Sequence, residues 1–157
     1  MLAQITAPNI SFDIYGPKED PVYWDACEAA IKKLPANVSA QYKGSVAPHE
    51  LENIYGQSHL MFLPSLNENF GHSIVESLLC GCPVLISDQT PWNDLSDYDA
   101  GFAFNLGKKE AFATCITTLA QLSEKDYTLR CEAAIKYISN KIKIPEIIND
   151  YKRLFNA

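Results

Sequence analysis

The chain has 157 residues, 47% of them hydrophobic and 20% charged, a size that suits one domain burying roughly two thirds of the surface its unfolded form exposes. Its formal net charge is -6 and its 13 lysines and arginines are scattered, which argues against nucleic acid as a partner. The sequence has no apolar run of about 18 residues and no leader-like start, so we expect a cytoplasmic domain without a transmembrane segment.

Segments with the pattern of strands alternate with segments with the pattern of helices. Runs of β-branched and aromatic residues predict strands, and apolar residues spaced by three and four predict helices. In chain order we predict a strand at 10–16, a helix from Tyr23 to Leu34, a strand at 38–44, a short helix from His49 to Tyr55, a strand at 59–65, a helix from His72 to Cys80, a strand at 83–88, a short strand at 101–104, a helix carrying Phe112 to Leu122, one further helix, and a last helix from Pro145 to Phe155.

Strands that alternate with helices imply crossover connections, which join parallel strands. We therefore predict a single α/β domain with a Rossmann-like parallel sheet flanked by helices. The five cysteines lack paired CxxC spacing, and Cys80-Gly81-Cys82 offers only two of the four ligands of a structural zinc. We expect free thiols and no metal site.

Ligands of open parallel sheets bind beyond the carboxyl ends of the strands, so four loops are candidate sites: 16–19, 44–47, 64–71 and 88–93. The third contains "ENFGHSIVE", residues 68–76. If a helix begins at His72, Gly71 lets backbone approach a ligand and the free N–H groups of the first turn favour an anion such as phosphate. The alternative is that Asn69 and Gly71 are only turn and capping residues.

Glu76 lies one turn into this predicted helix. The apolar side of the helix consists of Ile74, Val75, Leu78 and Leu79. Glu76 instead shares a small, polar stripe with Ser73, Ser77 and Cys80. This stripe faces either solvent or a cleft. Because carboxylates accept hydrogen bonds from hydroxyl groups, Glu68 and Glu76 on the two sides of an anion site suit a sugar diphosphate that carries a ribose.

The stretch "FLPSLNENFGHSIVESLLCGCPVLISD" resembles the donor-binding core of the GT-B type, family 4 retaining glycosyltransferases. That family has a Glu-x7-Glu signature in a P-S/T-x-x-E-x-F-G context, followed by small-Gly-x-P-V. The matching residues are Pro64, Ser65, Glu68, Phe70, Gly71, Glu76, Gly81, Pro83 and Val84. Upstream, "IYG" and "YKGSV" agree with the family's preceding strands, and "SDQTPWNDL" resembles a bacterial subset that builds surface polysaccharides.

The resemblance implies roles for individual residues. Glu68 corresponds to the first motif glutamate, a catalytic-site residue that meets the transferred sugar, and the backbone of 69–71 (Asn69, Phe70 and Gly71) would follow the sugar and diphosphate. Glu76 corresponds to the second, which accepts the ribose hydroxyls. His72 is expected either to touch the donor or to cap the helix.

Looser correspondences place further residues near the nucleotide. Gly16 would lie beside it after the first strand, and the segment from Lys43 to Val46 would approach the base, largely through backbone groups. In the turn after Gly16, Lys18 is expected to be a solvated lysine rather than a partner of the diphosphate.

The implied activity is transfer of a hexosyl group from a nucleotide diphosphate sugar to an acceptor hydroxyl with retention, without a metal or other cofactor. The acceptor, a glycan or lipid-linked sugar, would bind an N-terminal domain, and the full-length enzyme would act at the inner face of the membrane. Residues 1–157 would form the donor-binding domain without its first strand and helix, inactive alone. Two alternatives are a stand-alone nucleotide-sugar-binding module and an interaction domain with a vestigial motif.

Overall fold

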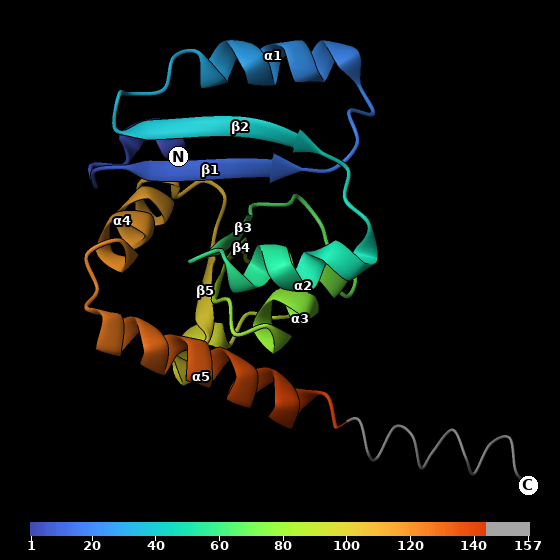
Figure 1. Cartoon of the computed structure of the whole chain (residues 1–157), viewed down its shortest axis with the longest axis vertical. Coiled ribbons are helices and arrows are strands. Elements are labelled where there is room, and N and C mark those ends of the chain that lie inside the picture. Colours follow the sequence, from blue (N-terminus) through green and yellow to red (C-terminus); the bar gives the residue numbers. More distant parts are fainter. Residues whose placement is uncertain (144–157) are drawn as a thin grey trace, which may run out of the picture.

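A computed structural model describes residues 1–143 of the chain, and Figure 1 shows the arrangement of its elements. The strands are β1 (Ile10–Tyr15), β2 (Val38–Gly44), β3 (Met61–Leu63), β4 (Val84–Ser87) and β5 (Gly101–Phe104). The α-helices are α1 (Pro21–Ile31), α2 (Pro48–Gly56), α3 (His72–Leu79), α4 (Lys109–Leu119) and α5 (Glu124–Lys141). Two 3-10 helices that we did not predict are η1 (Leu2–Gln4) and η2 (Leu95–Tyr98).

The predicted elements are found in the predicted order, with shifted boundaries. Helix α1 begins earlier than expected because the Asp20 carboxylate caps it, accepting hydrogen bonds from the backbone N–H groups of Val22 at 2.9 Å and Tyr23 at 3.1 Å. Strand β3 has three residues instead of the predicted seven and stops before Pro64, which has no N–H for a strand ladder. The predicted helix from Pro145 to Phe155 lies outside the described residues.

All strand pairs are parallel, and helices flank them, so the predicted α/β class is confirmed. Hydrogen bonding divides the strands into two sheets rather than one, β1-β2 and β3-β4-β5. Crossover helices connect the strands of each sheet, as parallel pairing requires. In Figure 1 the arrows of β1 and β2 point the same way, toward the side where the chain continues into α2.

In the described part of the chain, no ladder of hydrogen bonds joins β1 to β3, and each of these strands has one free edge. The rings of Phe12 in β1 and Phe62 in β3 meet edge to face, with centroids 5.8 Å apart. Side-chain packing therefore joins the two sheets. The strands at this junction are only partly buried: Phe12 and Ile14 alternate with exposed residues, and all of β3 is half-buried.

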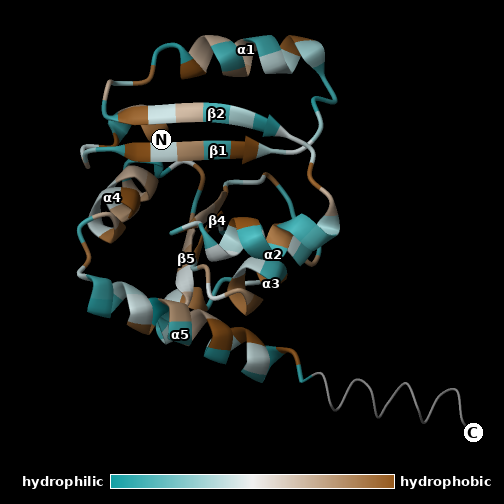
Figure 2. Ribbon diagram, in the orientation of Figure 1, coloured by the Kyte–Doolittle hydropathy of each residue, from teal (hydrophilic) through white to brown (hydrophobic). Residues whose placement is uncertain are grey.

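The three-stranded sheet is packed on both faces. Val84 and Ile86 of β4 belong to a core with α3, α5 and η2, while Leu85 belongs to a second core with α4 and the N-terminal segment around Ile5. All four residues of β4 are buried. In Figure 2, α5 carries both hydrophobic and hydrophilic residues, as expected for a helix with one packed side and one exposed side.

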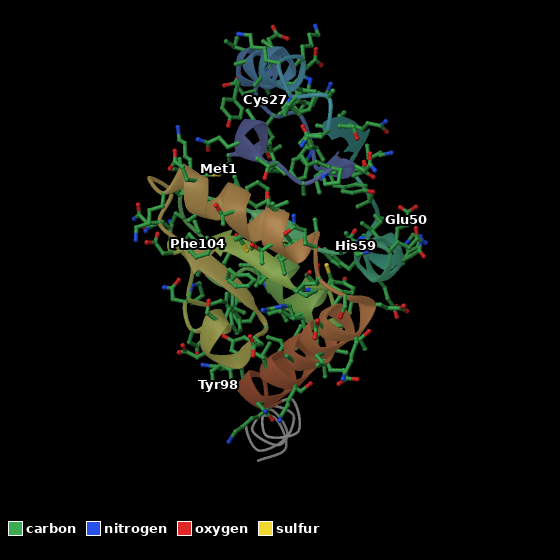
Figure 3. The ribbon with its side chains drawn as sticks, turned by 90° about the vertical axis from the view of Figure 1, so that its left-hand side faces the viewer. Met1, Cys27, Glu50, His59, Tyr98 and Phe104 are labelled. Carbon is green, nitrogen blue, oxygen red and sulfur yellow. The ribbon has the colours of Figure 1, made fainter. Side chains whose placement is uncertain are left out.

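All five cysteines are free thiols, as predicted. Cys82 and Cys115 lie in the core, and burial raises the pKa of the Cys82 thiol to about 11 and that of Cys115 to about 12. Cys27 lies on α1, at the opposite end of the molecule from Tyr98 of η2 (Figure 3). The core thiols are therefore neutral packing groups at physiological pH.

Gly71 marks the junction between the loop after β3 and helix α3. It has φ of 78° and ψ of 61°, the left-handed conformation that residues with a side chain rarely adopt. A Cβ atom at this position would lie 2.7 Å from Cδ1 of Ile74, which is fully buried. The loop-to-helix turn thus depends on glycine both for backbone freedom and for space.

We predict that Gly71→Ala lowers the free energy of unfolding by about 1–3 kcal/mol, the usual cost of a strained backbone. Chemical denaturation at neutral pH measures this. The control is Gly56→Ala at the end of α2, where a Cβ would meet nothing within 4 Å and where alanine raises stability by up to about 1 kcal/mol. Equal stability of the Gly71 variant and the wild type would contradict the assignment.

A second prediction concerns the free edges of β1 and β3. The Ile10 N–H donates to the Asn37 carbonyl at 2.9 Å, so the backbone N–H groups of Phe12 and Ile14 also point toward β2. The N–H groups of Ser11 and Asp13 point the other way, to the free edge of β1. Hydrogen exchange followed by NMR should be slow at Phe12 and Ile14 and much faster at Ser11 and Asp13. Uniform protection along β1 would show that the free edge is paired in solution.

Candidate functional site

The loop between β3 and α3 holds most of the predicted site residues. Glu68 is half-buried, and its Oε1 accepts a hydrogen bond from the Gly71 N–H at 3.1 Å. Asn69, Phe70 and His72 are exposed, with Phe70 at 44%. The structure therefore brings Glu68 to the start of α3 and leaves Asn69, Phe70 and His72 exposed on either side of the buried Gly71.

His72 is the first residue of α3. The helix has Gly71 as its N-cap and no capping hydrogen bond from a side chain, so the interpretation of His72 as a helix cap is wrong. Its ring instead packs against the ring of Phe70, with centroids 4.9 Å apart. The imidazole is thus held beside the exposed ring of Phe70.

The exposed and buried positions of α3 differ from the predicted polar stripe and apolar side. Glu76 is exposed as expected, but Ser77 is completely buried and donates to the Cys82 carbonyl at 3.0 Å. Leu79, which we assigned to the apolar side, is 45% exposed. The helix packs on both α5 and β4 and thereby buries the Ser77 position, while Leu79 turns away from them.

Tyr55 of α2 is a neighbour of Glu76 that the sequence analysis did not identify as a site residue. Burial, together with the negative charge of Glu76, raises the pKa of Tyr55 to about 12. Tyr55 was visible only as an apolar position of a short predicted helix. Contact between α2 and α3 was needed to place it beside Glu76.

Gly16, Lys43 and Val46 form a second group at the carboxyl ends of β1 and β2. The Gly16 N–H donates to the Gly44 carbonyl at 3.0 Å, and the Tyr42 hydroxyl donates to the Gly16 carbonyl at 2.7 Å. Two of the predicted loops are therefore held together by backbone and phenol hydrogen bonds. Val46 is half-buried and lies two residues before α2 begins at Pro48.

The lysines of this region are engaged with their own neighbours. Lys43 Nζ lies 3.6 Å from a carboxylate oxygen of Asp13 on β1. Lys18 Nζ lies 3.6 Å from a Glu28 carboxylate oxygen and over the ring of Trp24 at 4.2 Å. Lys18 is exposed, as expected, and its ammonium lies against side chains of α1; its lack of a role toward a diphosphate stays a prediction.

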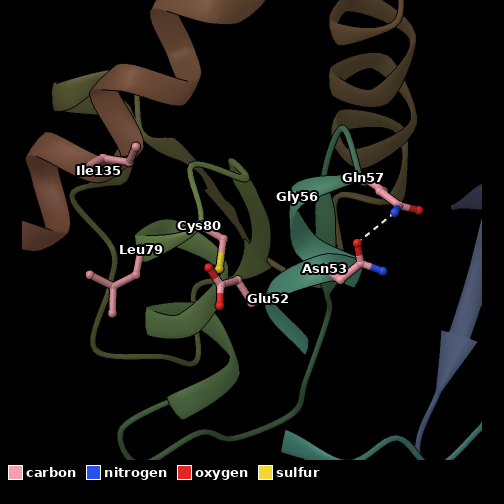
Figure 4. A pocket seen from close by; sticks show the side chains of 7 residues that line it. All are labelled: Glu52, Asn53, Gly56, Gln57, Leu79, Cys80 and Ile135. Carbon is pink, nitrogen blue, oxygen red and sulfur yellow. Dashed lines mark hydrogen bonds between the residues drawn. The ribbon is translucent and has the colours of Figure 1, made fainter. Parts of the chain in front are cut away.

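A hollow of about 470 Å³ lies between α2, α3 and α5 (Figure 4). The residues lining it are Glu52, Asn53, Gly56, Gln57, Leu79, Cys80 and Ile135. None of the predicted site residues lines it, although Glu76 lies one turn before Cys80, and its charge adds to the effect of burial in raising the pKa of that thiol. The hollow adjoins the Glu76 side of α3.

The loop after β4 contacts the loop after β3, and the sequence analysis did not assign any of its residues. The indole N–H of Trp92 donates to the Phe70 carbonyl at 2.5 Å. The signal for this contact was present, because residues 88–93 follow a predicted strand and therefore belong to the candidate loops. No spacing rule indicated which side chain of the loop would reach its neighbour.

The chemistry available at the start of α3 is hydrogen-bond donation from backbone and acceptance by carboxylates. The first intrahelical bonds run from Ile74 and Val75 to the Gly71 carbonyl, so the N–H groups of His72 and Ser73 lie before the ladder. They form the positive end of the helix dipole. Within residues 1–143, no cluster of three acidic, histidine or cysteine side chains fits a metal ion, and no helix is long and apolar enough to cross a membrane.

Known proteins resemble the chain in fold and in sequence. Anabaena HepE, solved in complex with UDP, superposes with a TM-score of 0.75 at 22% identity over 95% of this chain, and its complex with UDP-glucose superposes with 0.74. Sucrose-phosphate synthase from Thermosynechococcus elongatus superposes with 0.60 at 19% identity over 98% of the chain. These structures establish the likeness in fold.

A curated relative, O-antigen chain mannosyltransferase B of Escherichia coli, is 29% identical over 140 residues, which are 87% of this chain. The chain spans only 35% of that relative, 43% of HepE and 40% of the synthase. The model of one family, described as glycosyl transferases group 1, matches residues 1–141. As the motif around Glu68 and Glu76 implied, the chain belongs to the group 1 glycosyl transferases.

Proposed function

We propose that this chain is the donor-binding domain of a retaining glycosyltransferase that transfers a hexosyl group from a nucleoside diphosphate sugar to an acceptor hydroxyl. The observation that carries the proposal is the geometry at the start of α3. Gly71 turns the chain into the helix, Glu68 folds back onto its N–H, and Glu76 stands exposed one turn later. Two carboxylates thus bracket the positive end of a helix.

Each part of the donor has a complementary group. Glu68 uses Oε1 for the Gly71 N–H and offers Oε2 to a sugar hydroxyl. The backbone of Asn69, Phe70 and Gly71 follows the sugar and diphosphate, with His72 beside it. Glu76 accepts the two ribose hydroxyls, since a carboxylate can hold both at once.

The base and its ribose extend toward the carboxyl ends of β1 and β2. Gly16 and the segment from Lys43 to Val46 would contact the base through backbone groups, because the Lys43 ammonium is engaged with Asp13. Tyr55 would lie beside the ribose, since its phenol responds to the charge of Glu76. HepE, which shares this fold, was solved with UDP and with UDP-glucose, so we include a uracil nucleotide among the candidate donors.

Catalysis by this domain would be electrostatic. Negative charge builds on the diphosphate as its bond to the sugar breaks, and the N–H groups of His72 and Ser73 already point out of the helix start. Because these dipoles are fixed by the fold, they stabilise the leaving group without reorganising. Glu68 would orient the sugar, and we assign the pair no acid–base role of the kind found in glycoside hydrolases.

We further propose that a longer protein provides the acceptor site on an N-terminal domain. The relatives are about two to three times as long as the part of them that this chain spans. The free edges of β1 and β3 would accept one more parallel strand, which would join the two sheets.

The similarity to an O-antigen chain mannosyltransferase supports a surface polysaccharide or a lipid-linked glycan as the acceptor. Five free thiols suit a reducing, cytoplasmic location, and we place the full-length enzyme at the inner face of the membrane.

Binding of nucleotides to the chain tests the donor site. Calorimetry with UDP, UDP-glucose and GDP-mannose should find a compound that binds. Glu76→Ala should lower the affinity for both the nucleoside diphosphate and the sugar nucleotide by about tenfold or more, as expected for lost hydrogen bonds to a charged group. Glu68→Gln, which keeps an oxygen acceptor for the Gly71 N–H, should lower only the affinity for the sugar nucleotide. Glu132→Ala on the exposed surface of α5 is the control. Unchanged binding by the Glu76 variant would refute the site.

Exchange at the free edges tests the proposed extra strand. In the longer protein, the amides of Ser11 and Asp13 should become as protected as those of Phe12 and Ile14, because the added strand accepts their hydrogen bonds. Hydrogen–deuterium exchange on the intact protein measures this change. Rapid exchange at Ser11 and Asp13 in the intact protein would show that the edge stays open.

A further inference from the structure

The loop after β4 supports the proposed donor loop through three hydrogen bonds. The Ser87 hydroxyl donates to the Ser65 carbonyl at 2.5 Å, at the start of both loops. The Glu68 N–H donates to the Gln89 carbonyl at 3.1 Å. The Trp92 indole N–H donates to the Phe70 carbonyl at 2.5 Å, so successive positions of one loop hold successive positions of the other.

Trp92 is a buried and closely packed residue of this support. It is only 7% exposed, and its own N–H donates to the hydroxyl of Thr90 at 3.2 Å. Its ring meets Phe70 edge to face at 5.8 Å and Tyr137 of α5 at 6.2 Å. A buried, packed indole therefore holds the carbonyl of a residue whose side chain is largely exposed.

The anchoring continues into α5. The Tyr137 hydroxyl donates to Asp94 at 2.6 Å, and the Lys141 ammonium contacts the other oxygen of the same carboxylate at 2.5 Å. Partial burial would raise the pKa of Asp94, but the bonds from Lys141 and Tyr137 outweigh it and keep the pKa below its usual value. Asp94 is therefore ionised at neutral pH and fixes the helix that packs behind Trp92.

Trp92 and Glu68 hold the two ends of a single peptide unit. The unit joins Phe70 to Gly71 and is trans, so its carbonyl and its N–H point in opposite directions. The carbonyl is taken by Trp92 and the N–H by Glu68. Because Gly71 adopts positive φ without penalty, this peptide is the one that could otherwise turn over.

We propose that Trp92 is a positioning residue for the sugar and diphosphate of the donor. By holding the Phe70 carbonyl, it fixes the orientation of the Phe70–Gly71 peptide, and with it the carboxylate of Glu68 and the entry to the first turn of α3. The inference rests on the proposed function, since it assumes that this loop binds the donor. Trp92 contacts the loop assigned to the sugar and diphosphate and none of the residues assigned to the ribose or the base, so its effect should be confined to the diphosphate sugar end.

The variant Trp92→Phe removes the indole N–H and keeps an aromatic ring in the core. Its affinity for the sugar nucleotide that the wild type binds, measured by calorimetry with UDP-glucose and GDP-mannose, should fall by about five- to tenfold, the effect of one lost buried hydrogen bond. Affinity for UMP or GMP, which lack the second phosphate and the sugar, should change less than about twofold. Equal losses for both ligands would indicate general damage and overturn the proposal.

Trp24→Phe is a matched control. Trp24 lies on α1 and its indole N–H donates to a Glu28 carboxylate oxygen at 2.5 Å, the same distance as in the bond of Trp92. This variant should leave the ratio of the two affinities unchanged, because Trp24 packs on Tyr42 beside the Gly16 loop and an effect there would reach both ligands alike. If the wild type binds no sugar nucleotide, the proposed function fails and the role of Trp92 fails with it; if the wild type binds and Trp92→Phe binds equally well, only the present inference fails.

A second measurement needs no variant at Trp92. The chain has two tryptophans, so its NMR spectrum contains two indole N–H signals, which Trp24→Phe assigns. Addition of the sugar nucleotide should shift the Trp92 signal, because the ligand contacts the peptide to which it is bonded, whereas UMP or GMP should leave the Trp92 signal in place. A bound sugar nucleotide that moves neither signal would overturn the proposal even if Trp92→Phe did not fold.

Discussion

The packing of β4 on both faces and the pairing of both its edges constrain the whole molecule. Its four residues are buried, and β3 and β5 are hydrogen-bonded to its two sides. Val84 and Ile86 enter one core and Leu85 the other, so a shift of the strand by one residue would exchange the contents of the two cores. The position of every loop at the carboxyl end of this sheet follows from that register, including the contact of residues 87–92 with residues 65–70.

Much of this architecture could be predicted from the sequence. Runs of apolar residues and apolar positions at helical spacing predicted the order of elements and the parallel pairing. Gly71, followed by a polar helix start, predicted the candidate site. The division into two sheets was not predictable from single segments, because it depends on which strands become neighbours. Sequence similarity to a known family was needed to choose between a functional site and a simple helix start, since both have the same local pattern.

The errors also have physical causes. Ser77 and Leu79 were assigned from the angular position of one isolated helix, whereas α3 packs on both α5 and β4, which buries a serine and leaves a leucine outside. Trp92 and Tyr55 lie in segments that meet other segments distant in the sequence, and no periodicity predicts such contacts. The contacts of Lys18 with Glu28 and two aromatic rings were not predicted either, because they join a loop to α1 and β2.

Because no ladder joins β1 to β3 in the described residues, the two parts of the proposed site lie on separate sheets. The residues expected to meet the base lie on the β1-β2 sheet, and those expected to meet the sugar follow the β3-β4-β5 sheet. In residues 1–143 these two groups are held apart by side-chain packing, including the rings of Phe12 and Phe62, and not by a continuous ladder. Under the proposed function, a strand that pairs with both free edges would replace this packing by backbone hydrogen bonds, and the distance between the base end and the sugar end of the site would then depend on that strand.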